Sequence, residues 1–173
     1  MTPGESRSDA NAGTARVGIG YDSHRFGPGG PMILGGVSIP GDVHLRAHSD
    51  GDAVAHAVTD AVLGAAGLGD IGALFPDHDP ANAGRDSIAM LADAVSRLRG
   101  AGWLVQQVDV TLIAEHPRVT PYRDAMRQRV AEALAVALPN VSIKGKSNEG
   151  MGWIGASEGL ACIAVATVVP AGA

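Results

Sequence analysis

Three residues of the chain are of types that bind divalent metals. Asp22 and His24 are separated by one residue, and His56 follows further along the chain. The run around the first pair alternates as a strand does, so both side chains point to one face. Gly18 and Gly20 precede them on that face, which the pattern predicts to be open for a ligand. Two ligands from a strand and one from a helix leave a coordination position free, as in catalytic zinc sites. The opposite, core-facing side of the strand would carry Val17, Ile19 and Tyr21.

The helix that would carry His56 is predicted from apolar residues at helical spacing over 54–65, and it should end near Gly67. Ser49 is predicted to cap this helix, and a second role in binding an anion at the helix N-terminus stays open. His56 falls on the polar stripe of the helix. Asp60, one turn further on, either accepts the second ring N–H of His56 or is a solvated surface charge.

The only two lysines of the chain, Lys144 and Lys146, stand together near its C-terminal end. At a spacing of two they share one face of a strand, and Ser147 and Asn148 add hydrogen-bond donors. Glu149 can hold a hard cation such as magnesium against phosphate oxygens. The cluster therefore predicts phosphate recognition, and an ordinary solvated edge strand is the alternative.

Composition limits the classes of partner. Thirteen basic against 18 acidic residues give a net charge of −5, which argues against broad binding to nucleic acid. Cys162 is the single cysteine, so an intrachain disulfide is excluded, and it lies in an apolar run. The absence of a disulfide fits a reducing cytoplasm. Residues 1–14 are predicted to be a disordered tail without a signal peptide, and residues 15–170 a single domain. No apolar stretch reaches the ~20 residues of a membrane helix.

Strands and helices alternate along the chain, which predicts an α/β (α+β sandwich) fold with a sheet covered on one face by helices. The last strand, 160–169, is apolar on both of its faces, although one helix layer covers only one. We therefore expect a homo-oligomer whose sheets face one another around an axis. A helix layer on each face is the alternative. The remaining predicted elements are a hairpin over 31–39, an ordered loop over 67–80, helices over 87–99 and 121–137, and strands over 104–115 and 141–147.

Several runs together resemble one family, the 2-C-methyl-D-erythritol 2,4-cyclodiphosphate synthases of the non-mevalonate isoprenoid pathway. The runs, within residues 16–169, are GYDSHRF, ILGGVSIP, AHSDGDAVAHAVTDAVLGAAGLGDIGALFPDHDP, VDVTLIAEHP and KGKSNEGMGWIG. The resemblance implies a homotrimer with active sites shared between neighbours. It also implies the conversion of 4-diphosphocytidyl-2-C-methyl-D-erythritol 2-phosphate to the cyclic diphosphate with release of CMP.

The resemblance also implies roles for individual residues. Asp22, His24 and His56 would bind one zinc ion per subunit, and Glu149 a magnesium or manganese ion on the substrate diphosphate. The catalytic residues would be His48 and Ser147, which would stabilise the phosphates in the transition state. Residues 114–119 with Lys146 and Ser147 would shape the cytidine pocket, contributed by the adjacent subunit. The full set of substrate contacts would be Asp22, His24, His48, Ser147, Glu149, Ser49, Asp70, Ile71, Gly72, Phe75, Pro76, Asp77, His78, Asp79, Ala114, Glu115, His116, Pro117, Arg118, Val119, Lys146, Asn148 and Trp153.

Two positions depart from the pattern of the family. Lys146 stands in a run where the family often has threonine, so the phosphate contacts are expected to be distributed differently. Ala156 stands where many members carry arginine, which weakens any expectation that the trimer axis binds an isoprenoid diphosphate.

Two other functions fit part of the pattern. Two histidines and a carboxylate also form the iron site of non-haem oxygenases, although the lysine cluster has no use in that chemistry. A nucleotide-binding module with a structural metal is the second alternative. Metal analysis discriminates the first alternative, and release of CMP from the diphosphocytidyl substrate discriminates the second.

Overall fold

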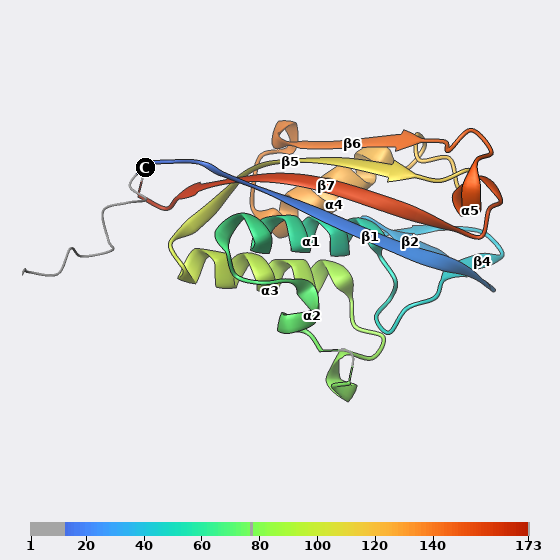
Figure 1. The fold of residues 1–173 in the computed structure, drawn as a ribbon, viewed down its shortest axis with the longest axis horizontal. Helices are drawn as coiled ribbons and strands as arrows, with labels where there is room; N and C mark the ends of the chain where they lie inside the picture. Colours follow the sequence, from blue (N-terminus) through green and yellow to red (C-terminus); the bar gives the residue numbers. More distant parts are fainter. Residues whose placement is uncertain (1–12, 77, 173) are drawn as a thin grey trace, which may run out of the picture.

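The computed structural model of the chain describes residues 13–76 and 78–172 (Figure 1). Its main sheet has five strands in the order β4-β1-β7-β5-β6. Only β5 and β6 run parallel, and all other neighbours are antiparallel. The predicted tail, residues 1–14, lies outside the described residues except for its last two. The strands of the sheet are β1 (Arg16–Pro28), β4 (Val43–Leu45), β5 (Trp103–Ile113), β6 (Val141–Lys146) and β7 (Gly159–Pro170).

Three long helices cover one face of this sheet, as predicted (Figure 1). Helix α1 (Ala53–Ala66) packs on β1 and β7, α3 (Ser87–Gly100) packs on α1, and α4 (Arg123–Leu134) packs on β6. Helix α4 ends before the predicted residue 137, because Ala135 has a left-handed φ of 51°. The smaller elements are β2 (Met32–Leu34) and β3 (Val37–Ile39), which form the predicted hairpin, and the short helices α2 (Ile71–Leu74), η1 (Pro80–Asn82), η2 (Leu138–Asn140) and α5 (Gly152–Gly155).

The core lies between the sheet and the helices. Every second residue of β7, from Leu160 through Cys162 to Val168, is fully buried against them. Burial raises the pKa of the Cys162 thiol well above its usual range, so it is a small apolar core residue. Val165 on the opposite face of β7 is 39% exposed, because no helix of the described chain covers that face. None of the helices in residues 13–76 and 78–172 is long and apolar enough to cross a bilayer.

The two faces of β1 are the reverse of those predicted. A Cβ at Gly18 would lie 2.1 Å from the carbonyl oxygen of Ala61, and one at Gly20 would lie 1.9 Å from that of Ala57. The glycines therefore let α1 approach the strand closely and do not leave room for a ligand. On the other face the apolar side chains are exposed: Val17 to 68%, Ile19 to 71% and Tyr21 to 56%.

The cap of α1 also differs from the prediction, because Asp52 and not Ser49 precedes the first turn. The buried carboxylate of Asp52 accepts hydrogen bonds from the amides of Val54 and Ala55 at the helix start. It also accepts from the amides of Gly35 and Gly36 at 2.8 and 2.6 Å. Both glycines have positive φ and form the β2–β3 turn. One carboxylate thus joins the hairpin to the helix that carries His56.

Candidate active site and metal centre

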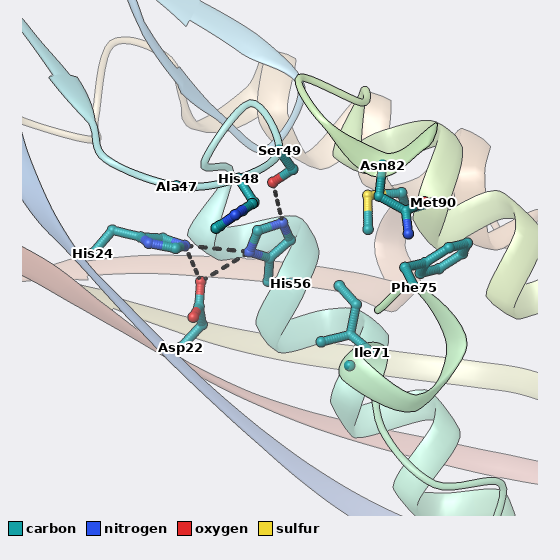
Figure 2. Close-up of a pocket in the computed structure, with 11 residues that line it drawn as sticks. Asp22, His24, Ala47, His48, Ser49, His56, Ile71, Phe75, Asn82 and Met90 are labelled. Carbon is teal, nitrogen blue, oxygen red and sulfur yellow. Dashed lines mark hydrogen bonds and ion pairs between the residues drawn. The ribbon is translucent and has the colours of Figure 1, made fainter. Parts of the chain in front are cut away.

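Asp22 and His24 on β1 and His56 on the first turns of α1 point toward one another (Figure 2). Asp22 Oδ2 lies 2.8 Å from His24 Nε2 and 3.2 Å from His56 Nδ1, and the two ring nitrogens are 3.3 Å apart. Four ligands at the 2.0–2.1 Å bond lengths of zinc in a tetrahedron are about 3.3 Å from one another. The triad therefore has the donor types and the spacing of three corners of such a tetrahedron.

The other ring nitrogens have partners that fix the histidine tautomers. Nδ1–H of His24 donates to the carbonyl oxygen of Arg46 at 3.1 Å. Nε2–H of His56 faces the hydroxyls of Ser49 and Ser87, at 3.0 and 2.9 Å. Each ring then presents the lone pair of its remaining nitrogen to the centre of the triad. Partners of this kind orient ligand histidines in metal sites.

Asp60 is not the partner of His56. Its carboxylate accepts a hydrogen bond from the amide of Ile71 at 2.7 Å, at the start of α2. Burial raises the pKa of Asp60. The partners of the second nitrogen of His56 are instead the hydroxyls of Ser49 and Ser87. Ser87, a fully buried serine at the start of α3, donates its own hydroxyl to Asp50. The second oxygen of Asp50 accepts from the amide of Ser87, which joins α3 to the loop before α1.

The electrostatics favour a cation at this point. Burial raises the pKa of Asp22, but the hydrogen bonds and charges of His24 and His56 outweigh it and hold the pKa well below the usual range. Burial lowers the pKa of His56, and the hydrogen bond and charge of Asp22 outweigh it, so the pKa is raised above 6.5. The triad thus combines an ionised carboxylate with a histidine that readily holds a proton, and a divalent cation can neutralise the same carboxylate.

A cavity of about 310 Å³ adjoins the triad. His48 and Ser49 approach it from the loop before α1, and Ile71 and Phe75 line its other side (Figure 2). Gly72 also belongs to the lining. His48 is exposed, and its carbonyl accepts a hydrogen bond from Gly84 that holds the loop. The guanidinium of Arg85 lies 4.7 Å from the centroid of the Phe75 ring and covers it. Three residues of the lining were not predicted, because nothing in the local sequence marks them as part of a site: Ala47, Asn82 and Met90.

The rest of the predicted substrate loop has mainly a structural role in the described chain. Asp70 caps α2 and Asp79 caps η1. The carbonyl of Pro76 accepts a hydrogen bond from the side chain of Asn82. His78 is exposed, and Asp77 lies outside the described residues. These residues shape the loop that presents Ile71 and Phe75 to the cavity.

A second cavity, of about 430 Å³, lies at the far edge of the sheet, where β5 and β6 end. It gathers the predicted nucleotide-binding segment 114–119 and the predicted pair Lys146 and Ser147, together with Thr120 and Gly145. The side chain of Val119 packs against the backbone of Gly145. A Cβ added at Gly145 would lie 3.0 Å from the Cβ of Val119. Among residues 13–76 and 78–172, none lines both this cavity and the one beside the triad.

The lysine cluster divides into two environments. Lys144 lies 2.5 Å from Asp109 on the uncovered sheet face, and this ion pair lowers the pKa of Asp109 although burial opposes it. Lys146 faces the second cavity. Beyond it, Ser147 donates to the carboxylate of Glu149. Of the two lysines, Lys146 therefore lines the second cavity and Lys144 does not.

Trp153 lies apart from both cavities, on α5. It is 41% exposed and lines a third, smaller hollow with His24 and Glu158. This hollow lies beside the triad residue His24.

Comparison with known proteins gives a consistent result. Residues 15–169 match the YgbB family. The 2-C-methyl-D-erythritol 2,4-cyclodiphosphate synthase of Gemmatimonas aurantiaca is 62% identical over 91% of this chain and 95% of its own length, and that of Alkalilimnicola ehrlichii is 53% identical over 88 and 94%.

Solved structures agree with the sequence matches. A CDP-bound 2C-methyl-D-erythritol-2,4-cyclodiphosphate synthase superposes with a TM-score of 0.81 at 37% identity, over 88% of this chain and 99% of that one. The bifunctional IspDF of Campylobacter jejuni gives a TM-score of 0.89 at 36% identity over 92% of this chain, which spans 43% of that longer protein. The chain therefore belongs to the YgbB family.

Proposed function

We propose that this protein converts 4-diphosphocytidyl-2-C-methyl-D-erythritol 2-phosphate to 2-C-methyl-D-erythritol 2,4-cyclodiphosphate and releases CMP. It is a phosphorus–oxygen lyase. The observation that carries the proposal is the pairing, in one chain of this family, of a triad with metal-binding residue types and a separate cavity lined by 114–120 and 145–147. Cyclodiphosphate synthases that share 62 and 53% of the sequence support it.

The residues of the triad fit zinc. Their nitrogen, nitrogen and oxygen donors are those of catalytic zinc sites, and their separations match its tetrahedral geometry. When bound, zinc would supply positive charge to a phosphate oxygen at the fourth position. Asp22, His24 and His56 would hold it, one ion per subunit. The same donors fit iron, so the identity of the metal is part of the test.

A second cation, magnesium or manganese, would be held by Glu149 against the diphosphate. Carboxylates and phosphate oxygens are the ligands that these ions prefer. Lys146 and the hydroxyl of Ser147 lie in the adjoining cavity and would face the same phosphates. His48 would donate to the phosphates from the metal side.

The reaction needs placement and charge more than covalent chemistry. An oxygen of the 2-phosphate attacks the β-phosphorus, a new P–O bond forms, and the bond from the β-phosphorus to the oxygen of CMP breaks. The leaving group takes that electron pair. Fixed donors and cations around both phosphates stabilise the charge that shifts between them, and no protein nucleophile is required.

We propose further that the protein is a homotrimer. The metal cavity and the nucleotide cavity lie at opposite edges of the sheet and share no residue, so one substrate would bridge them across neighbouring subunits. The exposed apolar face of β1 and β7 would pack against the same face of the other copies. We expect the protein in the cytoplasm and residues 15–170 to form one domain.

The decisive experiment follows CMP and the cyclic diphosphate by chromatography. The purified protein is assayed as isolated, after removal of metals with a chelator, and after return of zinc, magnesium or both. We expect activity only with both metals and close to one zinc per chain. Iron as the stoichiometric metal, with no release of CMP, would favour an oxygenase. Binding of CDP without any turnover in the presence of both metals would favour a non-catalytic nucleotide module.

A further inference from the structure

Glu115, the second residue after β5, holds a turn that lies more than thirty residues further along the chain. One oxygen of its carboxylate accepts hydrogen bonds from the backbone amides of Asn148 and Gly150, at 3.0 and 3.1 Å. These amides flank Glu149. The side chain of Glu115 is half-buried. Its Oε1 binds the turn after β6 through these two hydrogen bonds.

This turn has a conformation that needs support. Glu149 has a φ of 52°, in the left-handed region that residues with a side chain rarely adopt, and Gly150 follows with 73°. The two bonds to Glu115 fix the backbone on both sides of Glu149. The carboxylate of Glu149 in turn accepts a hydrogen bond from the Ser147 hydroxyl. The direction in which both side chains point thus depends on the turn that Glu115 holds.

Glu115 also belongs to the wall of the second cavity, which its neighbours 114–119 form. The amide of Ala114 donates to the carbonyl of Lys146 at 2.9 Å, just before the turn. Hydrogen bonds from two successive residues therefore join the two segments. The wall that would hold the nucleotide and the turn that would hold the cation are one connected unit.

We propose that Glu115 is a positioning residue that sets the Ser147 hydroxyl and the Glu149 carboxylate against the substrate diphosphate while its neighbours hold the nucleotide. The inference rests on the proposed function. It gives Glu115 a role through the turn and not through direct contact with the nucleotide. A misplacement of about 1 Å in such a site can reduce the rate on the order of 100-fold.

The test compares Glu115→Met, which keeps the length and loses the acceptor, with Glu115→Gln, which keeps one acceptor oxygen. The control is Glu132→Gln, at an exposed glutamate of α4 outside both cavities. Three quantities are measured: kcat for CMP release as a function of magnesium, zinc content, and the affinity for CDP by calorimetry with and without magnesium.

We expect Glu115→Met to lower kcat by roughly 10- to 100-fold and to raise the magnesium concentration that gives half-maximal rate. Zinc content and magnesium-free CDP binding should stay near those of the unaltered protein, and the gain in CDP affinity from magnesium should be lost. Glu115→Gln should recover most of the rate. If Glu115→Met fails to fold, Glu115→Asp, which draws the carboxylate back by one methylene, serves for the same comparison.

The outcomes separate this inference from the proposed function. An unaltered protein that releases no CMP refutes the function itself. An active protein whose Glu115→Met variant keeps its kcat and magnesium response overturns the role of Glu115. Loss of magnesium-free CDP binding in both Glu115 variants also overturns it, because Glu115 would then contact the nucleotide directly.

Discussion

The close packing of α1 on the glycines of β1 should determine the position of His56 in the candidate metal site. In Gly20→Ala the new Cβ would lie 1.9 Å from the carbonyl oxygen of Ala57, whereas ordinary contact begins at 3.4 Å. The helix backbone must then move by about 1.5 Å. His56 precedes Ala57 on the same turn, so its ring moves with it. Metal sites tolerate displacements of only about 0.2 Å in a ligand distance.

We therefore expect Gly20→Ala to lose stability and metal affinity together. Forcing extra atoms into a packed contact costs about 1–3 kcal/mol, or more where backbone must move. For a chain of this size, that lowers the unfolding temperature by about 2–12 °C. Zinc affinity, measured by competition with a chromogenic chelator, should fall strongly. Unfolding is followed by circular dichroism at one protein concentration, since association shifts it.

Gly64→Ala is the matched control. Gly64 lies on the exposed side of α1, and a Cβ there would have no atom within 4 Å. Alanine in this position should stabilise the helix by about 0.8–1 kcal/mol. If Gly20→Ala unfolds at the original temperature and binds zinc with the original affinity, the glycines are not there for helix packing. Normal stability with a defect only in substrate binding would restore the interpretation of an open ligand face.

Four further outcomes are expected. Glu149→Gln should raise the magnesium requirement of CMP release and leave zinc content unchanged; loss of zinc would contradict two separate cation sites. Ser87→Ala should weaken zinc binding by about 10- to 100-fold, because it removes an acceptor for the second nitrogen of His56, and titration against a chelator measures this. Ile19→Asp places a charge on the uncovered face and should convert the proposed trimer to monomers in light scattering; an unaltered mass would place the interface elsewhere. Because Asp22 raises the pKa of His56 above its unfolded value of 6.5, their pair stabilises the metal-free protein fully below pH 6.5 and loses that contribution as the pH rises through the raised pKa. Zinc competes with the same proton, so its affinity should increase over that window, and a flat profile from pH 6 to 8 would exclude this linkage.

The elements whose signals lie within a few neighbouring residues were predicted from the sequence. The C-terminal end of α1 agrees because Gly67 terminates the helix with a left-handed φ, and the hairpin agrees because Gly35 and Gly36 form its turn. Asp22 and His24 lie together because period two in a strand places them on one face. Each of these inferences uses residues within a few positions of one another.

The errors arise where a contact joins distant segments. Asp60 shares a helix stripe with His56, yet the amide of Ile71 meets its carboxylate because the chain turns back after α1. One of the two serine partners of His56 is Ser87, 31 residues later. Nothing in the local pattern around a serine at a helix start distinguishes a histidine partner from solvent. The cap at Asp52 was missed for the same reason, because its other two donors come from the hairpin.

The reversed faces of β1 and the apolar last strand have one physical explanation. A glycine face on a strand is compatible with a ligand or with a closely packed helix, and only the buried positions of Ala57 and Ala61 decide for the helix. Once α1 occupies that face, Ile19 and Val165 must lie on the other, where no described helix covers them. An apolar sheet face of this kind is stable in water only when another surface covers it. The same packing that brings His56 to the strand thus leaves the surface through which other copies would complete the site.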